Sequence, residues 1–158
     1  MQRLVGELER QLGTPIGDIR LSDVQVDDTP RGADGDAGLI ANLPFQLQPV
    51  SAHASFDVQN RGTAPVGLFV GTSFSWGLLE IVMGQKLFSR SKFYYYFNSS
   101  YVYDPGDRVG HAEGQIAETD LANRISSADF VVVEAIEAEL GIGHIVKFAA
   151  AVEALSRQ

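Results

Sequence analysis

Two short, continuously apolar runs place the tightest limits on how this chain can fold. Residues 66–71 read VGLFVG and residues 128–136 read ADFVVVEAI, and a helical pattern follows each run. An apolar run of this length without alternating polar residues is typical of a strand that is buried on both faces. Buried strands alternating with helices predict an α/β layer fold with a mainly parallel sheet.

Weaker patterns predict the remaining elements. Helices are expected over residues 2–12, within 73–88, over 113–127 and over 141–155, with one or two helical turns at 35–44. A strand is expected at 22–26, two short strands within 45–60 and an aromatic strand at 91–100, with a loop at 101–110. With no internal repeat and no linker, residues 1–158 are predicted to form a single domain.

Composition excludes several classes of function. The chain has 12 basic and 20 acidic residues and a net charge of −8, which argues against a nucleic-acid binder or a polybasic membrane-surface domain. It has no cysteine, so thiol catalysis, disulfides and cysteine-ligated metals are excluded. It contains no run of 18 apolar residues and no signal-peptide core, so neither a membrane span nor a signal peptide is expected in this chain. The acidic loop at 27–36 lacks the spacing of a calcium-binding loop, and no other metal or cofactor motif is present.

The most informative segment for chemistry is the turn after the first apolar run, Gly71-Thr72-Ser73-Phe74-Ser75. A serine between a buried strand and a helix lies at the carboxyl end of the sheet, where open α/β sheets bind ligands. The helix start provides free N–H groups for a developing oxyanion, and Gly71 allows a tight turn. The alternative is that Thr72, Ser73 and Ser75 only cap the helix.

A serine nucleophile needs a base, and three histidines are candidates. Asp107 and His111, four residues apart in a glycine-rich loop, form the most plausible acid–base pair. His53 lies in a polar extended segment and His144 in the first turn of the last helix, and for each of the three histidines the alternative is a surface or capping role. Glu134 follows the second apolar run and is either a functional carboxylate or a solvated charge.

The turn at 71–75 resembles the serine motif of the SGNH-hydrolase-like domain in alginate O-acetyltransferases of the AlgJ and AlgX type. Three further segments look similar in order and character, and with the turn they cover most of the chain from about residue 35. They are Gly35-Asp36-Ala37-Gly38 with the Leu-Pro that follows it, the Phe-Tyr-Tyr-Tyr-Phe strand, and the Val-Val-Val-Glu-x-x-Glu stretch at 131–137.

The resemblance implies a flavodoxin-like, three-layer α/β/α fold and a serine that accepts an acetyl group and passes it to a polysaccharide hydroxyl. By motif match the nucleophile is Ser73, supported by Gly71, Thr72 and Ser75. It implies a polysaccharide acceptor, an acetyl donor, other polysaccharide-biosynthesis proteins as partners, and a periplasmic or other extracytoplasmic location.

Three departures from the family pattern qualify this interpretation. The family takes its Asp and His partners from a D-x-H motif upstream of the serine, and this chain has none, so we expect the fold to be incomplete at the N-terminus. Ala138 stands where the family carries an arginine, and Thr72 replaces the aspartate of ordinary SGNH hydrolases. The sequence therefore predicts an exopolysaccharide O-acetyltransferase domain that is inactive as this chain alone. Alternatives are a catalytically incomplete carbohydrate-binding or assembly module of the same fold, and a carbohydrate acetyl esterase.

Overall fold

The structure is a computed structural model, and it describes residues 2–28, 51–62, 64–95, 98–137, 140–141 and 143–157. Two compact units are present: Met1–Asp18 with Val58–Gln158, and Ile19–Asp57. In chain order the elements are α1 (Gln2–Leu12), β1 (Gly17–Asp27), β2 (Ser51–Asn60), β3 (Gly67–Gly71), α3 (Ser75–Gly84), β4 (Ser91–Tyr95), β5 (Ser99–Tyr103), β6 (His111–Gln115), α4 (Glu118–Ser127), β7 (Phe130–Val133) and α5 (Gly143–Ser156).

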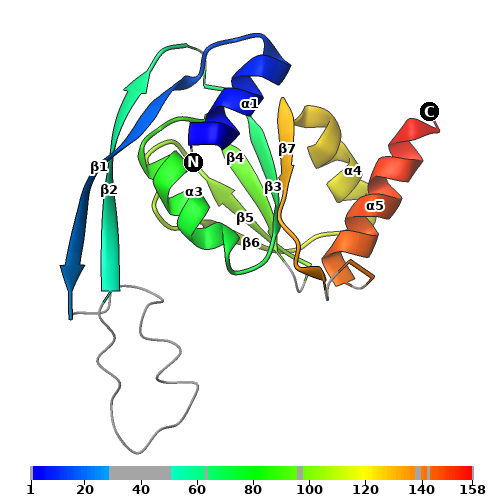
Figure 1. Cartoon of the computed structure of the whole chain (residues 1–158). Helices are drawn as coiled ribbons and strands as arrows, with labels where there is room; N and C mark the ends of the chain where they lie inside the picture. Colours follow the sequence, from blue (N-terminus) through cyan, green and yellow to red (C-terminus); the bar gives the residue numbers. More distant parts are fainter. Residues whose placement is uncertain are drawn as a thin grey trace, which may run out of the picture. The chain divides into compact units, whose positions relative to one another are not determined.

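The sheet of the larger unit is mixed. Its strand order is β6-β5-β4-β3-β7 (Figure 1). Strand β3 pairs in parallel with β4 and with β7, whereas β4–β5 and β5–β6 are antiparallel. A separate two-stranded antiparallel sheet is formed by β1 and β2.

The predicted flavodoxin-like fold with a mainly parallel sheet is therefore wrong. Three residues separate β4 from β5 and seven separate β5 from β6. A parallel connection needs a crossover of about a dozen residues or more, so such short links enforce antiparallel hairpins. The single strand expected at 91–100 is a hairpin, the loop expected at 101–110 begins with the end of β5, and the helix expected at 113–127 begins as β6.

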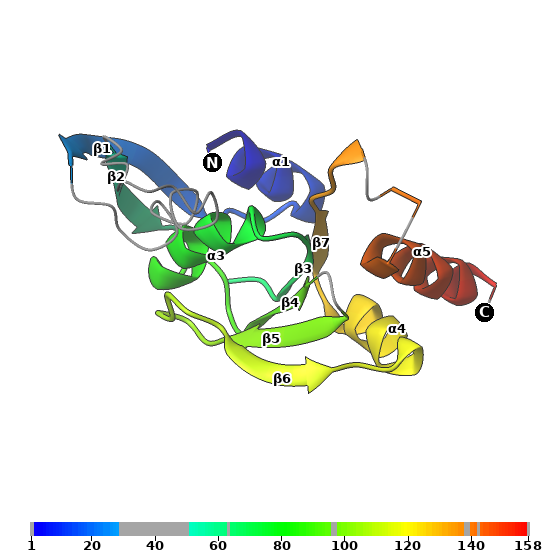
Figure 2. The ribbon, with the colours of Figure 1, turned by 90° about the horizontal axis from the view of Figure 1, so that it is seen from below.

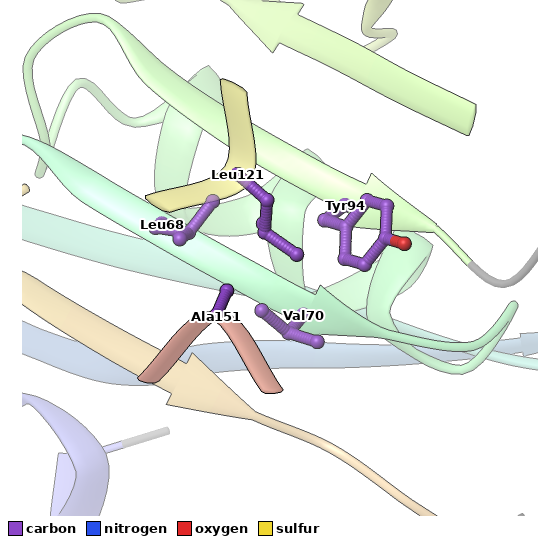
Figure 3. Close-up of a cluster of buried hydrophobic side chains, with 5 residues drawn as sticks. All are labelled: Leu68, Val70, Tyr94, Leu121 and Ala151. Carbon is purple, nitrogen blue, oxygen red and sulfur yellow. The ribbon is translucent and has the colours of Figure 1, made fainter. Parts of the chain in front are cut away.

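Both apolar runs form strands, β3 and β7, but the expected burial on both faces is confirmed for β3 and is wrong for β7, which lies at the edge of the sheet and is buried only at Phe130. All five residues of β3 are buried, and its side chains alternate between two helical layers. Leu68 and Val70 face α4 and α5, where they form a cluster with Tyr94, Leu121 and Ala151 (Figure 3).

The other face of the sheet is covered by α3. Its Trp76 ring packs on Phe93 at a centroid distance of 4.8 Å, and Phe69 packs on Phe88 at 5.9 Å. Figure 2 shows α3 on one side of the sheet and α4 and α5 on the other. Because β3 lies between two helical layers and two parallel neighbours, its carboxyl end is a firmly held point of the unit.

The helix predicted at 2–12 is confirmed as α1, whose Val5 and Leu8 are buried. The strand expected at 22–26 lies within β1, and the predicted terminal helix corresponds to α5. The helical turns expected at 35–44, most of the acidic loop and the first residues of the 45–60 segment lie outside the described residues.

Candidate functional site

The predicted serine turn lies at the carboxyl end of β3. Strand β3 ends at Gly71, α3 begins at Ser75, and residues 72–74 make the connection. The helix N-cap is Phe74, in the right-handed helical region at φ −67°, and it makes no side-chain capping bond. Thr72 Oγ1 instead accepts a hydrogen bond from the Phe74 N–H at 3.3 Å. Thr72 therefore bonds the backbone at the helix start, as the capping alternative predicts, whereas among the described residues no backbone N–H donates to the Ser73 or Ser75 hydroxyl.

A carboxylate from the neighbouring strand holds the turn in place. Glu134 follows β7, which runs parallel to β3, and its N–H donates to the Val70 carbonyl at 2.8 Å. Its Oε2 accepts hydrogen bonds from the Thr72 N–H at 2.8 Å, from Thr72 Oγ1 at 2.7 Å and from Ser75 Oγ at 3.2 Å. One carboxylate oxygen thus satisfies three donors on residues that are themselves only 4% exposed.

This close approach explains why a glycine ends β3. A Cβ at Gly71 would overlap Ser75 Oγ and would lie 2.9 Å from Glu134 Oε2. Real Cβ atoms do not approach other atoms so closely, so a side chain here would displace the hydrogen-bonded cluster. Gly71 is required for space, because its φ is not among the positive values.

Ser73 differs from its neighbours in the same turn. It is exposed, whereas Thr72 and Ser75 are buried. Within the described parts of the chain, neither its hydroxyl nor its backbone N–H has a hydrogen-bond partner, and only its carbonyl is engaged, by the Trp76 N–H at 3.3 Å. The following residue, Phe74, is 76% exposed. The structure therefore presents one serine hydroxyl and one amide N–H at the start of α3, where the helix dipole favours negative charge.

The predicted pair Asp107 and His111 forms, but at the other end of the sheet. His111 Nε2, on the first residue of β6, lies 3.2 Å from Oδ2 of Asp107, which is on the β5–β6 connection. The register places His111 beside Val102 and next to Lys92 and Leu68, whereas Gly71, the residue before the serine turn, aligns with Tyr95. Ser73 and the Asp107–His111 pair are therefore not brought together.

The pair has a local structural role instead. Asp107 Oδ2 also accepts the Asp104 N–H at 2.9 Å, so the same carboxylate closes the loop that joins β5 to β6. The His111 side chain is 68% exposed. An exposed ion pair of this kind stabilises a protein only slightly.

His144 is not brought to Ser73 either. His144, in the first turn of α5, is buried with its ring 6.3 Å from that of Tyr94. That ring lies on the α4 and α5 face of the sheet, and Ser73 leads into α3 on the opposite face. His53 belongs to β2 in the Ile19–Asp57 unit.

A second carboxylate that sequence reasoning missed joins four elements. Glu113 of β6 accepts hydrogen bonds from Ser100 of β5, Arg124 of α4 and Lys92 of β4. Partial burial raises the pKa of Glu113, but the Ser100 hydrogen bond and the two positive charges outweigh it, so the pKa is lowered overall. Nothing in the sequence signalled this cluster, because Glu113 was expected on a helix.

The described residues contain no group of three His, Cys, Asp or Glu side chains that could hold a metal ion. Among the same residues, no helix has the length and apolar character needed to cross a membrane. A scan against protein-family models and searches of curated proteins and of solved structures found no match to this chain. The resemblance to the alginate O-acetyltransferase domains therefore depends on the motifs alone, and the evidence for function is the local geometry around Ser73.

Proposed function

We propose that Ser73 is the nucleophile of an acyl-transfer site that passes an acetyl group to a polysaccharide hydroxyl outside the cytoplasm. One observation carries the proposal. Of the three hydroxyl residues in the turn, Thr72 and Ser75 are buried and bonded to Glu134, whereas Ser73 is exposed and its hydroxyl and N–H are unengaged among the described residues. The turn is thus organised around the residue that the sequence motif singles out.

The acetyl transfer would proceed in two steps. Ser73 Oγ attacks the acetyl carbonyl carbon, its proton passes to a base, and the donor leaves with the electrons of its former acyl bond. The negative charge that forms on the carbonyl oxygen is stabilised by the Ser73 N–H and by the start of α3. A polysaccharide hydroxyl then attacks the acetyl-serine, which transfers the acetyl group and restores the Ser73 hydroxyl. Neither His111 nor His144 lies at Ser73, and among the described residues no hydrogen-bond partner of the Ser73 hydroxyl could act as the base.

The test is acylation by an activated aryl acetate, followed by peptide mapping of the acetylated residue. We expect slow acetylation at Ser73, because the serine lacks a contacting base and removal of a base costs orders of magnitude in rate. The signal should disappear in Ser73→Ala and persist in Ser127→Ala, a matched change of an exposed serine at the end of α4. A folded protein with no acetyl-Ser73, or with equal acetylation after Ser73→Ala, would overturn the proposal.

The second candidate is a carbohydrate-binding module without catalysis, and two observations favour it. Ser73 has no described histidine or carboxylate in contact, and a group of partly exposed aromatic rings lies just beyond it. Trp76 in the first turn of α3 lies 5.2 Å from Tyr95 and 4.7 Å from Tyr101, measured between ring centroids.

This alternative predicts that the chain binds polysaccharide equally well before and after Ser73→Ala and transfers no acetyl group. Product analysis separates transfer from an esterase activity, because an esterase releases free acetate and a transferase yields acetylated glycan.

A further inference from the structure

The two edges of the five-stranded sheet are built differently. Strand β6, at one edge, has the sequence HAEGQ, and all five of its residues are exposed. Its pairing with β5 is broken by a register shift at Ser100 and Tyr101, and Gly114 has a φ of +94°. Polar residues and bulges are the ordinary means by which an edge strand avoids pairing with another chain.

Strand β7, at the other edge, has none of these protections. Its sequence is FVVV, and among the described strands it pairs with β3 alone. The Glu134 N–H, directly after β7, bonds the Val70 carbonyl of β3 at 2.8 Å, and the register pairs Val70 with Val133. Since alternate residues direct their backbone groups to opposite sides, Phe130 and Val132 face β3, whereas Val131 and Val133 direct their backbone groups to the open edge. Val133 is 48% exposed on this strand.

Helix α5, which packs on the same half of the sheet, is apolar on more than its inner side. Ala151 and the partly buried Ile145 and Phe148 pack against the β3 cluster. Val146 and Val152 are nevertheless 48% and 42% exposed. A helix that is apolar on both sides is ordinarily covered on both. Figure 1 shows β7 and α5 in the same half of the unit, with no other described strand beyond β7.

We propose that this flank, defined as β7 together with the exposed side of α5 that carries Val146, is the interface of a two-fold symmetric dimer of this chain. Antiparallel pairing of β7 with its copy would use the backbone groups of Val131 and Val133 and continue the sheet through the dimer. A two-fold interface joins the same patch on both subunits, so the patch must be self-complementary. A short, uncharged, β-branched strand meets that condition.

Charge placement on α5 favours a second copy over an unrelated partner. Its fourteen residues carry one lysine and one glutamate, Lys147 and Glu153. If two α5 helices cross antiparallel about Ala150, Lys147 of each copy lies opposite Glu153 of the other. The helix contributes no net formal charge while the chain carries −8, so two copies of α5 approach each other without a net repulsion between the helices.

Sedimentation velocity over a range of protein concentrations tests the dimer and its location. We expect a dimer whose dissociation constant rises about tenfold or more in Val133→Lys and in Val146→Lys, because a lysine at either site places an unpaired charge in the interface. Val109→Lys is the matched control, since Val109 is 76% exposed on the β5–β6 connection, at the other edge of the same sheet, and should leave the dimer unchanged.

A charge exchange tests the symmetry itself. Lys147→Glu and Glu153→Lys should each weaken the dimer, and the double exchange should restore most of the affinity. Amide exchange at Val131, whose N–H faces the open edge, should be slow in the dimer and should accelerate in Val133→Lys at equal folded fraction, as judged by circular dichroism. The proposal would be overturned if the protein were a monomer at all concentrations, or if Val133→Lys left the dimer dissociation constant unchanged. It would also be overturned if the double exchange gave a weaker dimer than either single variant. None of these results depends on Ser73.

Discussion

The two ends of the mixed sheet each hold a carboxylate close to groups of possible catalytic use, but the two carboxylates are placed by different means. At the carboxyl end of β3, Glu134 crosses from β7 to bind a turn that lies 59 to 62 residues earlier in the chain. At the opposite end, Asp107 binds His111 and the Asp104 N–H within one loop. The first arrangement needs the folded sheet, whereas the second needs only a loop conformation.

Candidate sites in such a chain differ in how far apart in the sequence their residues lie. A local Asp–His spacing is a weak indicator, because a loop satisfies its own polar groups in this way. Convergence of distant residues at adjacent parallel strand ends is a stronger one, since the fold positions those residues together. The comparison predicts that the Glu134 cluster contributes more to stability and to the serine turn than the Asp107 pair does.

The largest effect is expected from Glu134→Ala. The change leaves the Thr72 N–H and two hydroxyls without their acceptor in a largely buried setting, and we expect a loss of about 2–3 kcal/mol of unfolding free energy. Glu134→Gln keeps an acceptor oxygen and should lose less. Urea unfolding measures both. Equal stability of the wild type and Glu134→Ala would show that the cluster is not what holds the turn.

Two glycines on either side of Ser73 offer a matched test. Gly71→Ala places a methyl group against Ser75 Oγ and Glu134, and we expect a cost of about 1–2 kcal/mol. Gly77→Ala in α3 meets no atom within 4 Å and should stabilise the protein by about 0.5–1 kcal/mol through helix propensity. Thermal unfolding of both variants gives the comparison, and the same sign for both changes would contradict the packing at Gly71.

Glu113 is a third carboxylate for comparison, and it joins antiparallel strands of the sheet to helix α4. The pKa of Glu113 is lowered in the folded state. Its contribution to the free energy of unfolding is therefore present above the unfolded pKa of about 4.3 and is lost as the pH falls through the folded pKa. We expect Glu113→Gln to be less stable than the wild type by about 1 kcal/mol at neutral pH. The difference in unfolding free energy between the wild type and Glu113→Gln should become smaller at acid pH. A difference that is independent of pH would mean that the Glu113 charge has no part in it.

The sequence predicted well where one pattern determined one element. The apolar run at 66–71 became β3, and the turn after it exposes Ser73 as expected. The aromatic run after Ser91 misled, because β-prone residues continue through the Tyr95–Ser99 hairpin and conceal the change of direction. The role of Glu134 could be predicted only if β7 were known to be the parallel neighbour of β3. Local residue spacing does not show which distant strands pair.

The smallest effects are expected at the Asp107–His111 pair. His111→Ala should change the unfolding free energy by about 0.5 kcal/mol or less, because the imidazole is mostly exposed and its partner retains the Asp104 N–H. The same variant should leave acetylation of Ser73 unchanged, since the pair lies at the other end of the sheet. Peptide mapping at equal folded fraction measures this, with Ser73→Ala as the negative control. If His111→Ala abolished acetylation while the protein stayed folded, the pair would have to act on Ser73, and the separation of the two sheet ends would not describe the reacting molecule.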